Sequence, residues 1–178
     1  MQMRRGQDEA ALQTLEQLEA SGDTNSRGLE LLARLCQKLG RNERVRELAP
    51  RLRAARELPE AQVNEILAQA QLDAVREAGD RRDAAALEGA WSELPRVLRR
   101  LPQSIVAYAR SAMACDRHAE AEKALRELIE ETGDVAAVRL YGDVVLPDAL
   151  APLERAEAWL RKRPEDPDLL ASCGRLCL

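Results

Sequence analysis

The feature that most constrains this chain is a pair of apolar patterns with helical spacing in residues 102–133. Apolar residues recur there at intervals of three and four, first at Ile105, Tyr108, Ala109 and Ala112, then at Ala121, Ala124, Leu125 and Leu128. Such spacing places each set on one face of a helix. The small side chains of Ala109 and Ala121 allow two backbones to approach closely. We therefore predict a hairpin of two amphipathic helices.

The positions of the small residues within this unit follow a known repeat pattern. Counted from Pro102, Ala109 and Ala121 take the eighth and twentieth places, and Leu125 takes the twenty-fourth. In this the unit resembles the tetratricopeptide repeat. Gly133 replaces the usual closing proline and can still end the second helix. The resemblance implies a stack of such hairpins.

Related patterns recur along the chain with a period of about 34 residues, as in that repeat. We predict an all-α, tetratricopeptide-repeat-like, right-handed solenoid of about ten antiparallel helices that forms a single domain over residues 1–178. Its predicted parts are a half repeat at 8–20, a repeat at 26–58, a divergent helix pair at 59–101, repeats at 102–133 and 134–163, and a half repeat at 167–178.

The predicted repeats share one seam of small residues at their eighth places, namely Ala33, Ala109, Gly142 and Gly174. In the first half repeat, we expect Ala11, Leu15 and Leu18 to face inward. In the fourth unit, the helical pattern is expected to run from Asp134 to Val145. Together these positions define the buried side of the predicted stack.

The divergent pair departs from the repeat pattern at Pro95. Proline has no N–H and clashes with the preceding turn, so the helix must kink or restart there. Asp83 is a predicted N-cap at the start of the second helix of the pair. The large apolar residues expected to pack around the bend are Trp91, Leu94, Val97, Leu98 and Leu101.

A half repeat at each end is typical of a fragment, because terminal repeats normally carry a polar capping face. We therefore expect a longer parent chain. The last helix is predicted to leave an apolar face uncovered and to support self-association, through Leu169, Leu170, Cys173 and Leu176.

Composition argues against several classes of partner. The net charge of −4 does not favour nucleic acid, and two Trp, two Tyr and no Phe leave few rings for stacking on bases. The sequence has no apolar run long enough for a membrane span, and its N-terminus lacks the apolar core of a signal peptide. We expect a soluble chain.

The chemistry-bearing residues do not form a catalytic or metal-binding pattern. The four cysteines lie in helical patterns without CxxC spacing and are predicted to be packing residues, at Cys36, Cys115, Cys173 and Cys177. Cys173 and Cys177 share a helix face, so they could bind a metal if a third ligand joined them. His118, the only histidine, is predicted to lie on the surface at a helix start. Glu120 and Glu122 are expected on exposed faces. We predict no enzyme activity, cofactor or metal.

Five segments between Trp91 and the C-terminus resemble the C-terminal part of the HemY-type porphyrin-biosynthesis proteins of proteobacteria: WSELPRVLRRLP, IVAYARSAM, AEAEKALREL, RLYGDV and AEAWLRKRPEDPDLLASCGRLCL. The match covers roughly residues 85–178. It implies an N-terminal anchor in the bacterial inner membrane, a repeat region and an association with late haem synthesis. A flavin-dependent oxidase shares the family's name, but the chain has no GxGxxG motif, so that activity is not implied.

Three arginines follow the small eighth places, at Arg34, Arg110 and Arg175. In a tetratricopeptide stack this place faces the concave groove. Arginine can bind carboxylates of an acidic peptide or of porphyrin propionates. The alternative is that all three are ordinary solvated charges. Asp143 holds the equivalent place in the fourth unit, which interrupts this row of arginines.

We predict a non-catalytic scaffold that binds a protein segment, acidic in character, in its groove. A haem-biosynthesis enzyme is a candidate partner. The alternative function is direct porphyrin or haem binding, or participation in a tetrapyrrole enzyme complex.

Overall fold

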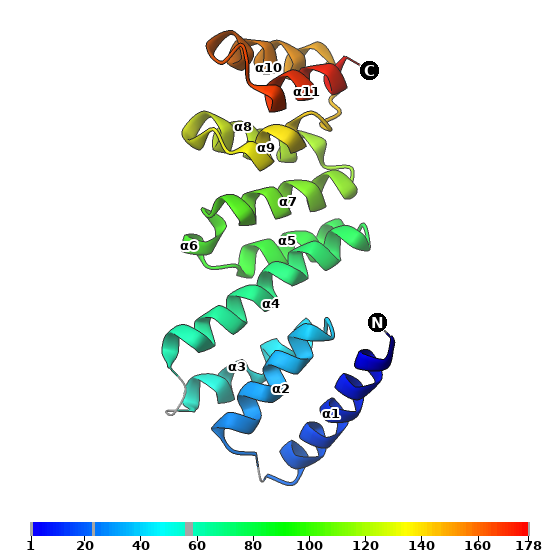
Figure 1. Ribbon diagram of the computed structural model, residues 1–178, viewed down its shortest axis with the longest axis vertical. Coiled ribbons are helices and arrows are strands. Elements are labelled where there is room, and N and C mark those ends of the chain that lie inside the picture. Colours follow the sequence, from blue (N-terminus) through cyan, green and yellow to red (C-terminus); the bar gives the residue numbers. More distant parts are fainter. Residues whose placement is uncertain (1, 23, 56–58, 178) are drawn as a thin grey trace. The chain divides into compact units, whose positions relative to one another are not determined.

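A computed structural model describes residues 2–22, 24–55 and 59–177, with side chains from residue 6 onward (Figure 1). Residues 56–58 of the predicted repeat 26–58, and Leu178 of the last half repeat, lie outside the described residues. Within the described residues there is no strand, and the helices are α1 (Gln2–Ala20), α2 (Ser26–Lys38), α3 (Asn42–Ala54), α4 (Glu60–Asp80), α5 (Ala84–Glu93), α6 (Arg96–Arg99), α7 (Pro102–Ala114), α8 (His118–Thr132), α9 (Val135–Tyr141), α10 (Leu150–Lys162) and α11 (Pro167–Leu176). The prediction of an all-α chain is confirmed.

Contacts divide the chain into two compact units, Met1–Ala74 and Val75–Leu178. In the first unit α2 packs on both α1 and α3. In the second unit α7 packs on α5, α6 and α8, α8 packs on α9, and α10 packs on α11. In addition, α9 contacts both α7 and α11. The single solenoid domain over residues 1–178 stays a prediction.

Side-chain caps fix where several helices begin. Asp83 accepts a hydrogen bond from the Ala86 backbone N–H at 2.9 Å, which confirms its predicted role as the N-cap of α5. Asp134 caps α9 in the same way. Gly133, with φ of 67°, ends α8 in the left-handed conformation that glycine adopts without strain. These local signals were readable from the sequence.

Pro95 interrupts the helical pattern as predicted. Helix α5 ends at Glu93, Leu94 and Pro95 are extended, and α6 starts at Arg96. The helix therefore restarts rather than kinks. Leu94 is buried in the bend, but Val97 is 76% exposed, so its predicted packing there was wrong.

The first unit has a core built from α1 to α4. Its fully buried residues include Leu12, Leu32, Ala33, Cys36, Val45, Leu48 and Leu52. In α1 the predicted inward face was off by one residue: Ala11 is exposed and Leu18 is 44% exposed, whereas Leu12 is buried. Each residue turns about 100° around a helix, so this shift moves the apolar face of α1 toward Leu12 and Leu15.

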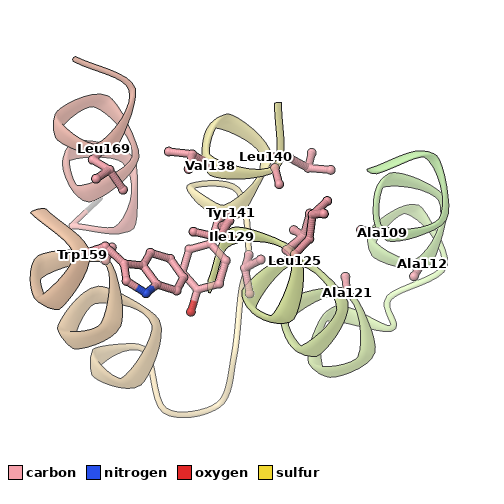
Figure 2. Close-up of a cluster of buried hydrophobic side chains, with 14 of the residues drawn as sticks. Ala109, Ala112, Ala121, Leu125, Ile129, Val138, Leu140, Tyr141, Trp159 and Leu169 are labelled. Carbon is pink, nitrogen blue, oxygen red and sulfur yellow. The ribbon is translucent and has the colours of Figure 1, made fainter. Parts of the chain in front are cut away.

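The second unit has its core between the paired helices α7 to α11 (Figure 2). Leu125 and Ile129 of α8 meet Val138 and Leu140 of α9 there. The Tyr141 ring packs edge-on against Trp159 of α10, with ring centroids 4.8 Å apart. This ring contact joins α9 to α10 across the loop between them.

The predicted seam of small residues is buried at three of its four members. Ala33, Ala109 and Gly142 are buried. Gly174 is exposed, and a Cβ added to it would meet no atom within 4 Å, so its place in the seam was wrong. The buried small residue of α11 is Ser172. Two residues turn the helix by about 200°, which puts Gly174 on the opposite side.

Helix α9 is shorter than the pattern predicted. It ends at Tyr141 with Gly142 as its C-cap, well before Val145. A Cβ on Gly142 would lie 2.9 Å from the Ser172 Cα, so α11 passes close to the end of α9. Beyond Gly142 the chain leaves the helix and buries Val144 in the core. This tertiary contact favours the loop over a longer helix.

The apolar face predicted for α11 is largely covered by the chain itself. Leu169 is fully buried, and Cys173 and Leu176 pack partly against the core. Leu170 is 50% exposed. Leu169 was therefore wrongly placed on an uncovered face, because α9 covers it. Self-association stays a prediction.

Candidate functional site

The candidate site is a groove in the second unit, lined by the end of α4, one face of α7 and the start of α9. Its volume is about 540 Å³, within the range of pockets that bind small molecules or peptide side chains. We call it the α7 groove. Val106 and Ala107 of α7 and Ala136 of α9 contribute its apolar part.

The wall formed by α4 depends on Gly79. A Cβ added there would lie 2.6 Å from the Ser111 Cβ and 2.7 Å from the Ser111 Cα. Real Cβ atoms do not come this close to a backbone atom, so only glycine lets α4 approach α7 here. The close approach fixes the end of α4 beside the lining face of α7.

Four charged residues border the α7 groove: Arg76, Asp80, Arg110 and Asp134. The Asp134 carboxylate already accepts the Ala137 backbone N–H at 2.8 Å as the cap of α9. Arg110 is exposed, and within the described part of the chain it has no ion-pair partner. Its guanidinium is therefore available to an acceptor from outside.

Arg34 lies in the first unit and is engaged within it. Its Nε donates to the Glu30 carboxylate at 2.8 Å, and Arg27 contacts the same carboxylate at 2.8 Å. Gln62 of α4 donates to it at 2.6 Å. Glu30 is only 3% exposed. The hydrogen bond from Arg34 is the largest influence on the pKa of Glu30, and with Arg27 it outweighs burial and lowers that pKa.

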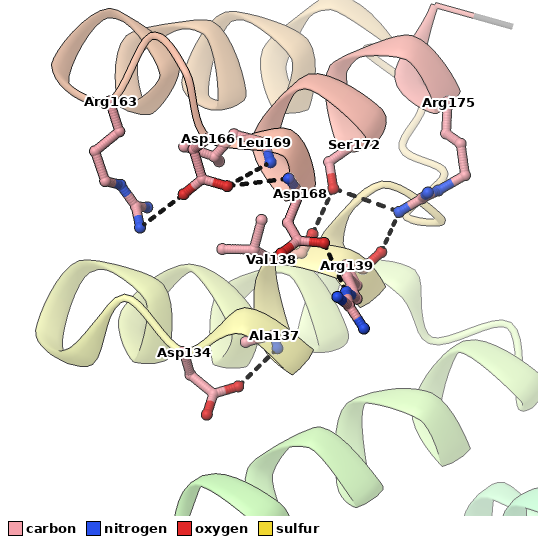
Figure 3. A network of polar contacts seen from close by, with 10 residues as sticks. All are labelled: Asp134, Ala137, Val138, Arg139, Arg163, Asp166, Asp168, Leu169, Ser172 and Arg175. Carbon is pink, nitrogen blue, oxygen red and sulfur yellow. Dashed lines mark hydrogen bonds and ion pairs between the residues drawn. The ribbon is translucent and has the colours of Figure 1, made fainter.

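Arg175 is also engaged, between α9 and α11 (Figure 3). Its Nε pairs with Asp143 at 2.9 Å, and its guanidinium donates to the Arg139 carbonyl and to the Ser172 hydroxyl. Arg175 lines a separate cavity of about 420 Å³, next to Val144 and Pro152. Ser172 in turn donates to the Val138 carbonyl at 2.6 Å.

The three predicted arginines therefore differ in their surroundings. Arg34 neutralises a buried carboxylate, Arg175 ties α11 to the end of α9, and Arg110 borders the α7 groove without an internal partner. Arg110 and Arg175 line different cavities of the second unit. Of the three, Arg110 is the one whose position suits an external ligand.

The sequence reasoning missed a buried polar cluster around Glu122. Glu122 was expected to be solvated, but it is 6% exposed. Its carboxylate accepts the Tyr141 hydroxyl at 3.0 Å and contacts Arg126 at 3.3 Å, and Arg155 of α10 also pairs with it. Burial raises the pKa of Tyr141 well above its usual range. The spacing of Glu122 and Arg126 was a local signal, but Arg155 lies on another helix and gave none.

The four cysteines and His118 differ in their burial and in their contacts. Cys36 is buried in the core, and burial raises the pKa of its thiol to about 11, so it is a neutral packing residue as predicted. Cys115 and Cys173 are partly buried, whereas Cys177 is exposed and was wrongly placed in the core. His118 Nδ1 accepts the Val145 backbone N–H at 3.1 Å and so holds the loop after α9.

The tryptophans are not equivalent. Trp159 is buried in the core. Trp91 is only partly buried and stacks on Tyr108, with ring centroids 4.4 Å apart and the ring planes at 23°. Both rings of this pair line a second cavity. Tyr108 and Arg110 are two residues apart in α7, so they point to different sides of that helix.

Two findings concern the whole described chain. No group of three or more His, Cys, Asp or Glu side chains is arranged to hold a metal ion in the part of the chain that the structure describes. Across the same ranges, none of the helices combines the length and the apolar character needed to cross a bilayer.

Comparison with known proteins found no matching family model, no matching curated protein and no matching solved structure.

Proposed function

We propose that this chain is a non-catalytic interaction module that holds a segment of another protein in the α7 groove. We further propose that its hairpins form a tetratricopeptide-type solenoid. The contacts of α9 with both α7 and α11 support that arrangement, as do the contacts of α7 with α8 and of α10 with α11. Helices already packed in the free protein present a groove at little ordering cost, which favours binding of an extended or helical segment.

The observation that carries the proposal is Arg110. It borders the groove, is exposed, and has no ion-pair partner among the described residues. A carboxylate of the partner can accept two parallel hydrogen bonds from its guanidinium. The adjacent apolar side chains of Val106 and Ala107 suit an apolar residue next to that carboxylate. We therefore propose a partner segment that combines an acidic with an apolar residue.

The resemblance to HemY-type proteins suggests the setting of this interaction. In that setting the partner is a haem-biosynthesis enzyme, and the chain belongs to a parent anchored in the bacterial inner membrane. A porphyrin, whose propionates are also carboxylates, is the competing ligand for Arg110. Direct titration separates the two.

The test compares two charge reversals of equal size. Partner proteins are captured by the unaltered chain, by Arg110→Glu and by Lys123→Glu, an exposed position on α8 outside the groove. A photo-crosslinker in place of Gln103, an exposed residue of the same groove, then identifies what occupies it. We expect loss of the crosslinked partner with Arg110→Glu and retention with Lys123→Glu.

Equal capture by Arg110→Glu and the unaltered chain would refute the proposal, as would equal loss with both variants. A Soret shift on titration with protoporphyrin IX, abolished by Arg110→Glu, would assign the groove to a tetrapyrrole instead of a protein segment.

A further inference from the structure

The second unit has another cavity that the proposed function does not use. It has a volume of about 450 Å³ and is lined by residues of α5, α6, α7 and α8. We call it the α8 cavity. The residues that decide its chemistry are two aromatic, two basic and two acidic ones, Trp91, Tyr108, Arg99, Arg100, Glu127 and Glu131.

The four charged residues of the α8 cavity are not paired with one another. Within the described ranges, none of Arg99, Arg100, Glu127 and Glu131 has an ion pair or a side-chain hydrogen bond. By contrast, Glu122 and Arg175 of the same unit are both satisfied internally. Opposite charges that line one cavity without meeting leave room for a ligand between them.

Arg99 supplies the second observation. Its Nε is buried and has no hydrogen-bond acceptor. A buried N–H without an acceptor is unfavourable, and native proteins rarely leave one unsatisfied. This Nε is closed off from the cavity, so a ligand carboxylate would meet the rest of the Arg99 guanidinium at the cavity wall and form a charge-assisted hydrogen bond there.

The aromatic pair gives the cavity an apolar wall. Trp91 and Tyr108 stack at 4.4 Å, and Ile105 and Leu128 line the same space. The Tyr108 hydroxyl donates to Glu120 at 3.3 Å, which holds the ring in place. Such a wall suits an apolar or aromatic group of the ligand.

We propose that the α8 cavity binds a free α-amino acid with a hydrophobic side chain. Its carboxylate pairs with Arg99 and Arg100, its ammonium group with Glu127 and Glu131, and its side chain packs against Trp91 and Tyr108. Two glutamates disfavour a ligand that is only an anion, and two arginines disfavour one that is only a cation. A zwitterion satisfies both pairs.

The experiment uses the fluorescence of Trp91. The chain has two tryptophans, so Trp159→Phe leaves Trp91 as the only reporter. L-phenylalanine is titrated beside 3-phenylpropionate, which lacks the ammonium group, and phenethylamine, which lacks the carboxylate. We expect a saturable change in Trp91 emission with L-phenylalanine, and binding at least about tenfold weaker for each singly charged analogue.

Matched variants assign the charges. Arg99→Gln and Glu131→Gln are each expected to weaken binding of L-phenylalanine at least about tenfold. Arg96→Gln and Glu130→Gln, which alter neighbouring residues outside the cavity, should leave it unchanged. Arg110→Glu should also leave it unchanged, because Arg110 borders the other groove.

Calorimetry on the unaltered chain with L-phenylalanine and L-leucine covers the case in which Trp159→Phe does not fold. Absence of saturable heat up to about 10 mM of both amino acids would overturn the proposal. Equal affinity for phenylalanine and its singly charged analogues would overturn it as well.

Discussion

Gly79 and Ser111 lie closer together than any larger residue at position 79 would allow. A Cβ added to Gly79 would lie only 2.7 Å from the Ser111 Cα. The contact sets the distance between α4 and α7 at the edge of the α7 groove. The nearby obstacle is backbone, which cannot rotate away as the end of a long side chain can.

Gly79→Ala is therefore expected to destabilise the second unit, by about 1–3 kcal/mol from overpacking. The usual preference of helices for alanine offsets part of this. Gly89→Ala is the matched control, because a Cβ on Gly89 in α5 meets no atom within 4 Å. That change should stabilise by about 0.5–1 kcal/mol. Urea denaturation followed by tryptophan fluorescence measures both, and equal effects of the two substitutions would contradict the contact.

The Glu122 cluster predicts a large loss of stability when its acceptor is removed. Glu122→Ala leaves the buried Tyr141 hydroxyl without its acceptor and the half-exposed Arg155 without this partner, and it should cost about 1–3 kcal/mol. Tyr141→Phe removes only one hydrogen bond and should cost about 1 kcal/mol. Glu130→Ala, at an exposed position of α8, should change the free energy of unfolding by less than about 0.5 kcal/mol. A Glu122→Ala variant as stable as Glu130→Ala would exclude a structural role for the cluster.

Glu30 predicts a pH dependence in the first unit. Its pKa in the folded protein is lowered, so its ionised form stabilises the fold above the unfolded-state value of 4.5. That contribution is lost as the pH falls through the lower folded pKa. The unfolding free energy of the unaltered chain should therefore exceed that of Glu30→Gln most at neutral pH.

The difference between these two chains should shrink on acidification below the unfolded-state pKa. Urea titrations at a series of pH values, followed by far-UV circular dichroism, give this difference directly. A gap that stays constant from neutral to acid pH would show that the ionised Glu30 contributes nothing specific.

His118 predicts a local effect on the loop after α9. Its Nδ1 accepts the Val145 amide at 3.1 Å, so His118→Ala should release that amide. Its hydrogen exchange should become about fivefold faster, as expected for loss of about 1 kcal/mol. The Leu150 amide, which donates to Asp148 at 3.1 Å, serves as the internal control in the same NMR experiment. Unchanged exchange at Val145 would mean that the imidazole does not hold the loop.

Local signals in the sequence were enough to place most helices. The Asp83 cap, the break at Pro95 and the helix end at Gly133 were all predicted, because each depends on the conformational preference of a single residue. The apolar spacing also placed Ala109 and Ala121 in the core.

Which face each terminal helix buries was harder to predict. Counting from Pro167 put Gly174 in the seam, but the fold buries Ser172. The face of α1 was shifted by one residue in the same way. An error of one or two positions turns a helix by about 100–200°, and only contacts with other helices correct it.

The candidate site was predicted only in part. Arg110 was identified from its place after a small residue, and it does border a groove. The pairing of Arg34 with Glu30 depends on side-chain conformation, which periodicity does not report. The pairing of Arg175 with Asp143 depends on the approach of two segments that are distant in the sequence. The α8 cavity was missed because its charges come from α6 and α8, whose nearness is a property of the fold.

The contacts of α10 bear on where this chain can be shortened. Arg155 and Trp159 both reach back to earlier helices, one completing the pairing of Glu122 in α8 and the other covering the ring of Tyr141 in α9. A version that stopped after α9 would expose an interior acid and an uncovered phenol. Helix α10 thus completes the interior of α8 and α9, and removing it would take away part of their own core.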